Sequence, residues 1–493
     1  MGPIRLTVIP TGTQTAGTSP LPDAGTKVPG RFTVVQADGT SALYVPEVQQ
    51  LYKLPPDLAD SFRVVARDVS SPEYDDARKI VLSLLGPPAE RPALQNRDRN
   101  PMLQDLVVHP SQVCNLDCKY CYAHEINKAN QTMTPEVADR VVERAMTLAG
   151  PKGLSSIKFL GGEPTVAWDI VERLVLGFGR AHRAAGVRGP AYVIVTNGTL
   201  VTPRMIEFAA GHQMYVLVSL DGRQEIHDTL RPTRGGAGSY EKAAATLRAL
   251  IAAGVDTAVE AVFTRQHVEQ GITPQAMVDH FRSFGIREMH ITVPVGTWHQ
   301  IDTIQQMDTV ASSFEQAARA SVRSFRTGDP WVLRGITAVL DGFLLQEERD
   351  YVCGAGRSFM AVNYDGEAFP CYLLESAGTS YGFVDDRWSE TRYAEVGRQF
   401  RRNGKTFHEV CRGCWANELC QSCLGYTFTI EEKVAKPPAW FCRFNKSIIA
   451  AVLGEVAAAR DSSDWPTFVT NMKQSLLDPA RPFVPVAREH RPH

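Results

Sequence analysis

The chain has 493 residues, more than one ordinary domain contains, so we expect two to four domains. Its 52 basic and 54 acidic side chains give a formal net charge of −2, which disfavours a nucleic acid or an anionic membrane as a partner held by bulk charge. An apolar fraction of 44% excludes a disordered or fibrous chain, and ten cysteines are too few for a disulfide-stapled secreted scaffold.

The first 104 residues predict three segments. Residues 1–30 are rich in Thr, Gly, Pro and Ser, which predicts a flexible N-terminus. Residues 31–90 predict a small, separate α+β domain, with short strands around an Asp38-Gly39 turn and helices over 56–68 and 71–86. Residues 91–104 are polar and contain proline, as is typical of a linker.

A regular alternation of strands and helices follows, over residues 105–328. The candidate strands are residues 105–110, 155–162, 191–198, 214–222, 256–264 and 288–295. The helical patterns between them carry Thr and Pro at their start or Gly at their end. Six such units predict a parallel α/β sheet with right-handed crossovers, curled into a partial (β/α)6 barrel, because a closed barrel needs eight units. The active site of such a fold lies at the carboxyl ends of its strands.

Residues 329–450 predict a separate cysteine-rich domain, and residues 451–493 a C-terminal helix and a frayed tail. No apolar run is long enough for a transmembrane helix, and the N-terminus lacks the features of a signal peptide. We therefore expect a cytoplasmic, reducing location and no membrane partner. In such a compartment clustered cysteines bind metal more often than they form disulfides.

Three cysteines, Cys114, Cys118 and Cys121, follow the first barrel strand with spacings of four and three residues. Three thiolates in one loop can bind three irons of a 4Fe–4S cluster and leave the fourth iron open. A structural zinc site would need a fourth ligand, and no suitably spaced Cys or His completes this one. For the seven cysteines between Cys353 and Cys442, a zinc-ribbon scaffold without enzymatic activity remains an alternative, because their paired CxxC spacing permits it.

The CxxxCxxC motif resembles the signature of the radical S-adenosylmethionine (SAM) superfamily. The resemblance implies that the open iron binds SAM and that reductive cleavage of SAM gives a 5′-deoxyadenosyl radical, which abstracts hydrogen. Taken alone, the polar residues at the ends of the next strands suit turns, helix caps or surface pairs equally well. The resemblance implies that the SAM contacts are Tyr122, Gly161, Gly162, Glu163, Pro164, Thr196, Asn197, Ser219, Asp221 and Arg231.

The C-terminal cysteines resemble the SPASM extension of radical SAM enzymes that modify peptides. The resemblance implies two auxiliary Fe–S clusters: a distal one ligated by Cys411, Cys414, Cys420 and Cys442, and a nearer one by Cys353, Cys371 and Cys423. One spacing departs from the pattern, since two residues rather than three separate Cys420 from Cys423. The nearer set also lacks a fourth cysteine, so that cluster has an open site, a non-cysteine ligand or fewer irons.

The same resemblance implies a maturase of ribosomally made peptides or small proteins that forms an intrapeptide crosslink. A Cys-sulfur-to-carbon thioether is expected, as in maturases such as that of quinohemoprotein amine dehydrogenase, with an external electron donor such as flavodoxin or ferredoxin. The alternatives are carbon–carbon crosslinking, epimerisation or reaction on a small molecule. The N-terminal domain resembles a recognition element that adds a leader-peptide strand to its sheet edge, although a cap or dimerisation arm would show the same pattern.

Tyr372 is the candidate catalytic residue. Sulfatase maturases have an Asp at this position, directly after the cysteine that corresponds to Cys371. A phenol with a pKa near 10 is a poor base at neutral pH, which disfavours sulfatase maturation. Tyr372 would then line the pocket, donate a hydrogen bond or pack.

Overall fold

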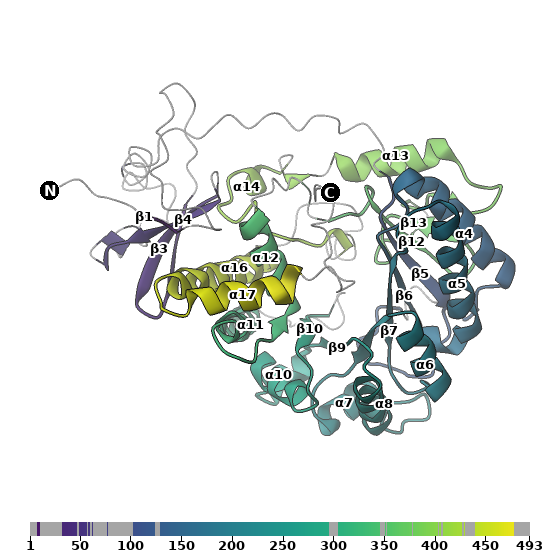
Figure 1. Ribbon diagram of the computed structural model, residues 1–493, viewed down its shortest axis with the longest axis horizontal. Helices are drawn as coiled ribbons and strands as arrows, with labels where there is room; N and C mark the ends of the chain where they lie inside the picture. The colour runs from purple at the N-terminus through teal and green to yellow at the C-terminus, as the bar shows by residue number, and fades with distance from the viewer. Residues whose placement is uncertain are drawn as a thin grey trace.

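The computed structural model describes residues 7–9, 32–46, 49–56, 58–59, 62, 76, 102–123, 129–294, 304–345, 351, 353–376, 378–402, 404–405, 408–425, 428 and 439–477. Figure 1 shows a curved sheet with helices on its outer side, next to a smaller sheet at the left. No helix in the described ranges is both long and apolar enough to cross a membrane.

The curved sheet has ten strands in the order β11-β10-β9-β8-β7-β6-β5-β12-β13-β14. Its six central strands follow the chain in sequence and are parallel, which confirms the predicted partial barrel. They are β5 (Asp105–Ser111), β6 (Ser156–Gly161), β7 (Ala191–Thr196), β8 (Tyr215–Ser219), β9 (Thr257–Val262) and β10 (Glu288–Thr292). Each lies within or overlaps a predicted strand.

The cysteine-rich region extends this sheet at one edge, which the sequence did not predict. Strand β12 (Phe359–Val362) pairs in parallel with β5, so the region that contains Cys353 and Cys371 lies beside the loop that follows β5. Two short strands continue the edge, β13 (Glu367–Phe369) and β14 (Gly382–Phe383), and β11 (Val332–Leu333) pairs with β10 at the opposite edge.

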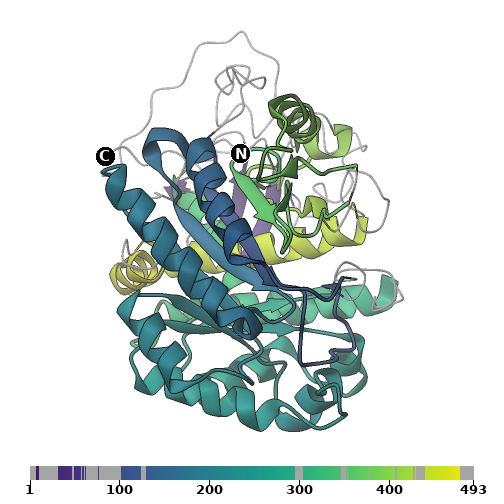
Figure 2. The same cartoon turned by 90° about the vertical axis from the view of Figure 1, so that its right-hand side faces the viewer.

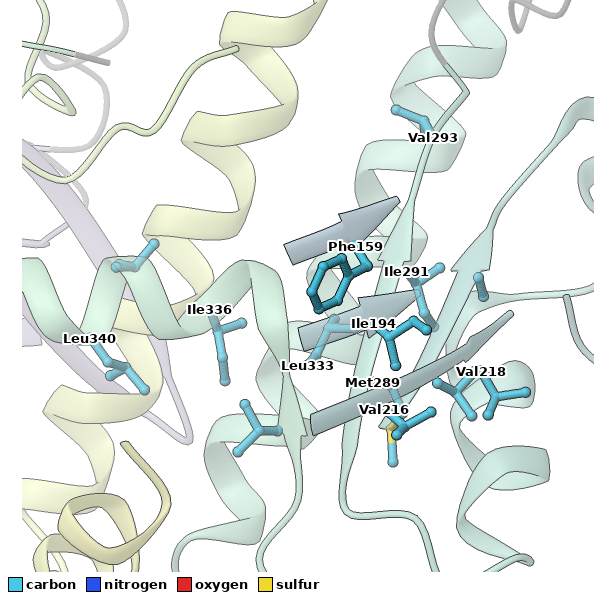
Figure 3. Close-up of a cluster of buried hydrophobic side chains, with 14 of the residues drawn as sticks. Phe159, Ile194, Val216, Val218, Met289, Ile291, Val293, Leu333, Ile336 and Leu340 are labelled. Carbon is cyan, nitrogen blue, oxygen red and sulfur yellow. The ribbon is translucent and has the colours of Figure 1, made fainter. Parts of the chain in front are cut away.

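The two faces of the barrel strands bury different side chains, as the period of two along a strand requires. Outward-facing residues such as Phe159, Ile194, Val216 and Met289 belong to the main core, which they share with the surrounding helices (Figure 3). The alternate residues form a smaller cluster on the inner face: Val193, Val195, Tyr215, Leu217 and Ala258. Polar groups on the inner face of the barrel therefore have apolar side chains as neighbours.

The helices begin and end at the residue types that the sequence indicated. In α4 (Pro135–Ala149), Thr134 caps the first turn by accepting from the Val137 N–H. The other helices of the barrel are α5 (Trp168–Ala184), α6 (Pro203–Gly211), α7 (Gln224–Leu230), α8 (Tyr240–Ala252), α9 (Arg265–Glu269), α10 (Pro274–Arg282) and α11 (Ile304–Ser324), with short 3-10 helices η1 (Gly150–Lys152) and η2 (Pro164–Ala167). The C-terminal region adds α12 (Arg334–Leu345), α13 (Glu390–Arg401), α14 (Glu409–Arg412), α16 (Ala439–Arg460) and α17 (Trp465–Leu477).

The N-terminal sheet is antiparallel, in the order β1-β4-β3-β2. Its strands are β1 (Thr7–Ile9), β2 (Thr33–Ala37), β3 (Thr40–Val45) and β4 (Gln50–Leu54). The predicted turn is confirmed, because Asp38 and Gly39 both have positive φ, as a tight hairpin requires. The prediction that residues 1–30 lack order is wrong for β1, a β-branched run that pairs with the edge of β4.

The N-terminal sheet is not a separate module, contrary to the prediction. Val35, Ala42, Tyr44 and Leu51 belong to the same core as the barrel and its helices. Both views place the yellow C-terminal helices beside the purple N-terminal strands (Figure 1, Figure 2). The opposite face of the sheet packs in its own cluster with Ala59 and Phe62 from the first predicted helix. The second predicted helix, residues 71–86, lies almost entirely outside the described residues.

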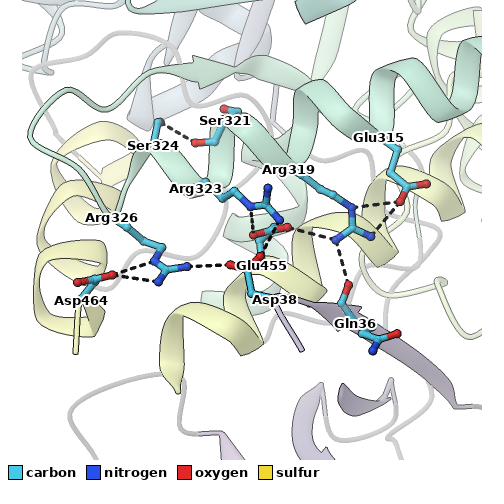
Figure 4. Close-up of polar contacts among 10 residues, drawn as sticks. All are labelled: Gln36, Asp38, Glu315, Arg319, Ser321, Arg323, Ser324, Arg326, Glu455 and Asp464. Carbon is cyan, nitrogen blue, oxygen red and sulfur yellow. Dashed lines mark hydrogen bonds and ion pairs between the residues drawn. The ribbon is translucent and has the colours of Figure 1, made fainter. Parts of the chain in front are cut away.

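A buried carboxylate joins this sheet to the barrel. Glu455 of α16 is 1% exposed and lies 2.7 Å from Arg323 Nε and 3.2 Å from Arg319 Nη1, both on α11 (Figure 4). Arg319 also donates to the Gln36 carbonyl, and Arg323 pairs with Asp38 of the turn between β2 and β3. The sheet, α11 and α16 therefore share one ionic network.

The C-terminal helices differ from the prediction. Helix α16 begins at Ala439, so Cys442 lies inside it, and not before the helix as the sequence suggested. Helix α17 was not predicted, and its Phe468 is fully buried. The remainder of the tail lies outside the described residues.

Gly454 sets how closely α16 approaches β2. A Cβ at this position would lie 2.8 Å from the Gln36 carbonyl oxygen, a backbone atom that cannot rotate away. We expect Gly454→Ala to lower the free energy of unfolding by about 1–3 kcal/mol, as overpacking does. The control is Gly335→Ala in α12, where a Cβ meets nothing within 4 Å and where unfolding free energy should stay unchanged or rise. Equal effects in denaturant titrations would contradict this account.

Candidate functional site

The loop after β5, which carries Cys114, lies directly on the two glycines at the end of β6. The Gly162 N–H donates to the Ser111 carbonyl at 2.8 Å, and the Glu163 N–H donates to the Val113 carbonyl at 2.9 Å. A Cβ on Gly161 or Gly162 would lie 2.5 or 2.4 Å from these same carbonyl oxygens. Because these glycines have no side chain, the backbone of the loop after β5 can lie directly against them. The sequence had suggested that a ligand approaches them.

Glu163 is buried and its carboxylate accepts hydrogen bonds from both sides of the β6–β7 gap. One oxygen accepts from Thr165 and from the Thr196 hydroxyl at 2.7 Å, and the other accepts from the Asn197 N–H at 2.7 Å. Burial raises the pKa of Glu163, and these hydrogen bonds offset only part of that effect. Pro164 opens the short helix η2 immediately afterwards.

Asn197 connects β7 to the cysteine loop. Its Nδ2 donates to Asn115 Oδ1 at 2.9 Å and lies 3.9 Å from Cys114 Sγ, while its Oδ1 accepts from Thr199. Asn115 and Thr199 were not predicted as site residues, because an Asn between cysteines and a Thr after a turn look like ordinary loop residues. The expected site residue Ser219 is buried at the end of β8.

Asp221 is the centre of a buried charged network. Its Oδ2 lies 2.8 Å from Arg231 Nε and accepts from the Tyr120 hydroxyl, and its Oδ1 accepts from the Val262 N–H at 2.9 Å. The Arg231 guanidinium also lies 5.4 Å from the centre of the Tyr120 ring. Both carboxylate oxygens are thus used within the protein and Asp221 is 0% exposed. This placement makes Asp221 a group that holds Arg231 and Tyr120 in position.

The electrostatics of this network favour the ionised pair. Burial opposes ionisation of Asp221, but Arg231, His227 and the hydrogen bonds from Tyr120 and Val262 outweigh it and hold the carboxyl pKa below its usual value. Burial lowers the pKa of His227 to about 4, so its imidazole is neutral near pH 7 and can accept from the Asp221 N–H. Tyr120, inside the cysteine motif, was missed because its partner is 101 residues away.

The three N-terminal cysteines influence one another electrostatically, which places them together. The pKa of the Cys114 thiol is raised to about 11 and that of Cys118 to about 12, mainly by burial and in smaller part by Cys121. Arg231 lowers both values, so the guanidinium held by Asp221 faces this group of thiols. A cation here favours the thiolate form that an iron–sulfur cluster requires.

The C-terminal cysteines influence one another's pKa values. The pKa of the Cys371 thiol is raised by burial and then by Cys423 and Cys353. The pKa of the Cys420 thiol is raised to about 12 by burial and then by Cys414, Cys442 and Cys411. The main influences on the pKa of Cys371 include none of Cys411, Cys414, Cys420 and Cys442. Those on the pKa of Cys420 include none of Cys353, Cys371 and Cys423. All ten cysteines lie in the described part of the chain, and none forms a disulfide.

A lysine that the sequence did not single out lies beside the second group. Lys405 is 1% exposed and its ammonium donates to the Asn417 carbonyl at 2.6 Å. It lowers the pKa of both Cys411 and Cys420. Lysine in a loop normally indicates solvent exposure, so only the fold shows that this one is buried.

Two tyrosines lie between the cysteine groups. The ring centres of Tyr122 and Tyr372 are 6.1 Å apart, and burial raises both phenol pKa values well above 10. Tyr372 therefore stays protonated at neutral pH, and its hydroxyl can donate a hydrogen bond but is a poor proton acceptor. Across the described residues, no three Cys, His, Asp or Glu side chains are arranged around a single metal ion.

The comparisons with known proteins point to one superfamily. Residues 108–283 match the sequence profile of the radical SAM superfamily. The radical SAM cyclopropyl synthase TigE of Paramaledivibacter caminithermalis is 33% identical over 155 residues, 28% of this chain and 31% of that protein. A cysteine-type anaerobic sulfatase-maturating enzyme of Clostridium perfringens is 32% identical over 149 residues, 29% of this chain and 39% of that enzyme. The matches therefore span less than half the length of these curated relatives.

A solved structure confirms the fold over a longer stretch. Native anSMEcpe with bound AdoMet and the Cp18Cys peptide superposes with a TM-score of 0.61 at 20% identity. The superposition covers 73% of this chain and 99% of that one, so it reaches beyond the residues that the superfamily profile matches. At this identity the similarity establishes the α/β fold.

The network around Asp221 predicts a large effect of a small substitution. Asp221→Asn leaves Arg231 buried without a carboxylate, and we expect the free energy of unfolding to fall by about 3–5 kcal/mol. The control, Asp139→Asn, breaks the exposed pair with Arg173 and should cost at most about 1 kcal/mol. Denaturant titrations measure both values, and equal costs would contradict the assigned role.

The pH dependence of this difference has a definite sign. Since the pKa of Asp221 is lower in the folded chain, its stabilisation is present above the unfolded value of about 4 and is lost as pH falls through the folded value. The stability gap between wild type and Asp221→Asn should therefore shrink at acidic pH.

Proposed function

From the radical SAM domain that residues 108–283 form, we propose that this chain is an enzyme that modifies a ribosomally made peptide or small protein with SAM and iron–sulfur clusters. The observation that carries the proposal is that the ten cysteines form no disulfide and that their spacing divides them into sets of three, three and four. One motif alone would support SAM cleavage, whereas three groups support a maturase with two auxiliary clusters.

The donor sets suit the proposed clusters. Cys114, Cys118 and Cys121 would hold three irons of the first cluster and leave one for SAM. When bound and reduced, SAM supplies a radical that removes hydrogen from an unactivated carbon. Glu163 holds the β6–β7 gap in register with the cysteine loop, and Arg231 presents positive charge to the thiolates.

The C-terminal groups would hold the auxiliary clusters. Cys411, Cys414, Cys420 and Cys442 supply four thiolates to a distal cluster, next to the buried ammonium of Lys405. Cys353, Cys371 and Cys423 supply three to a nearer cluster, which leaves one coordination position for another ligand. Electrons would come from an external donor such as flavodoxin or ferredoxin.

A peptide is the proposed substrate class because an antiparallel sheet is attached to the barrel. A leader peptide would bind by adding a strand to this sheet, through main-chain hydrogen bonds. In this structure β1 occupies the outer edge of β4, so a substrate strand at that edge would have to replace three residue pairs. The other outer strand, β2, packs near α16 and its Gln36 carbonyl accepts from Arg319.

The proposed reaction is formation of a thioether between a Cys sulfur and a carbon of the same peptide. The three-cysteine nearer group supports it, because an iron with an open position can bind a substrate thiolate. Tyr372 at the position of the sulfatase maturases' Asp weighs against formylglycine formation, since its buried phenol is a poor base.

The decisive experiment is anaerobic reconstitution followed by reaction with short Cys-containing peptides encoded beside the gene. We expect three iron–sulfur clusters by iron and sulfide analysis and a product two mass units lighter per crosslink. Zinc in place of iron would overturn the enzyme assignment. SAM cleavage with a small-molecule substrate and no peptide product would favour the small-molecule alternative. Removal of residues 1–90 is a poor test of peptide recognition, because it also removes the strands that pack against α16.

The Lys405 ammonium should raise the reduction potential of the distal cluster, because a nearby cation stabilises the more negative, reduced state. We expect Lys405→Met to lower that potential by tens of millivolts, measured by redox titration with EPR detection. Lys242→Met, on the exposed face of α8, is the matched control and should leave the potential unchanged. An unchanged potential in Lys405→Met would contradict the proposed position of the cluster.

A further inference from the structure

His109 and Glu375 form a buried pair that does not belong to the site described above. His109 is near the end of β5, and Glu375 follows Cys371 by four residues. His109 Nδ1 lies 3.0 Å from Glu375 Oε1, and the two side chains are 3% and 2% exposed. Burying a carboxylate without an arginine or lysine beside it costs free energy, so we expect this pair to have a function.

The pair is anchored on one side and incomplete on the other. Asn363, directly after β12, donates from Nδ2 to Glu375 Oε2 at 3.1 Å. Among the described residues, Glu375 Oε1 and both ring nitrogens of His109 are buried and make no hydrogen bond, so the 3.0 Å approach of Nδ1 to Oε1 is a close contact only. Buried polar atoms of this kind are rare in folded proteins, and one explanation is a bound molecule that completes the hydrogen bond.

The pair lies near the residues that directly follow Cys121 and Cys371. The Tyr372 ring centre is 6.3 Å from that of His109 and 6.1 Å from that of Tyr122, which directly follows Cys121. Glu375 contributes to raising the pKa of both Tyr122 and Cys371. The carboxylate is therefore near the end of the N-terminal cysteine loop and near the proposed ligands of the nearer cluster.

We propose that Glu375, held by Asn363 and placed beside His109, is the catalytic residue that takes the proton from the substrate thiol. This inference deepens the proposed function and rests on it. Forming one thioether breaks one S–H and one C–H bond and makes one S–C bond. The hydrogen atom leaves to the nucleoside radical derived from reduced SAM, the thiol proton passes to Glu375, and the remaining electron passes to the auxiliary iron–sulfur cluster.

The neighbouring candidates are less suited to accept this proton. Tyr372 remains protonated because burial raises its phenol pKa. Burial opposes the ionisation of Glu260 on β9, but Lys158 and His290 outweigh burial and the pKa of this carboxyl is lowered to about 2. Glu260 is therefore a weak base. Glu375 lies beside an imidazole, and its Oε1 makes no hydrogen bond within the described residues.

The first test compares Glu375→Gln with Glu367→Gln, a control whose carboxylate accepts from Ser380 on the neighbouring edge strands. In Glu375→Gln we expect crosslinked product to fall by about 10²-fold or more, the usual contribution of a general base. SAM cleavage with peptide, iron content, melting temperature and peptide affinity measured without SAM should remain close to wild type. Glu367→Gln should match wild type in every measurement.

The second test separates proton transfer from a structural role. Glu375→Ala leaves space for a small carboxylate, and formate or acetate should restore crosslinking to that variant, whereas an equal concentration of chloride should not. Crosslinking by Glu375→Gln at the wild-type rate, or no rescue of a folded and iron-loaded Glu375→Ala, would overturn the role of Glu375 alone. No crosslink by the wild type with any of the peptides would overturn the proposed function, and this role with it.

Discussion

The arrangement of the site depends on one interaction, the buried ion pair between Asp221 and Arg231 just after the carboxyl end of β8. Its carboxylate receives a hydroxyl from the cysteine loop, a guanidinium from the segment after α7 and a backbone N–H from β9. Because the charge has no solvent to stabilise it, every partner must be in place in the folded chain. The loop of three cysteines is therefore joined through Tyr120 to the same carboxylate that holds Arg231.

The carboxylates around the barrel's inner face divide into two kinds. Asp221 and Glu260 lie opposite permanently charged side chains and are held ionised, so they serve to position other groups. Glu163 is held by hydroxyl and amide donors, and Glu375 by an amide, beside an imidazole.

Local signals explain what could be predicted from the sequence. The six strands are short β-branched runs separated by helices with Thr or Pro starts, and the cysteine groups are defined by spacing within short segments. Tyr120, His109, Glu375 and Lys405 could not be found in this way, because each looks like a core or loop residue until a distant partner is known. The joining of the N-terminal sheet to α16 was missed for the same reason, since an apolar helix face does not identify the surface that it covers.

Helix α16 has a consequence for the order in which the chain reaches its final structure. The same helix covers the first sheet and carries Cys442, the last thiol of the distal group. During synthesis the N-terminal strands must wait for most of the chain before their apolar face is covered, and a cluster at the distal group cannot have all four of its thiolates earlier. Docking of the first strands and the approach of Cys442 to the other cysteines of its group therefore both depend on the late synthesis of α16.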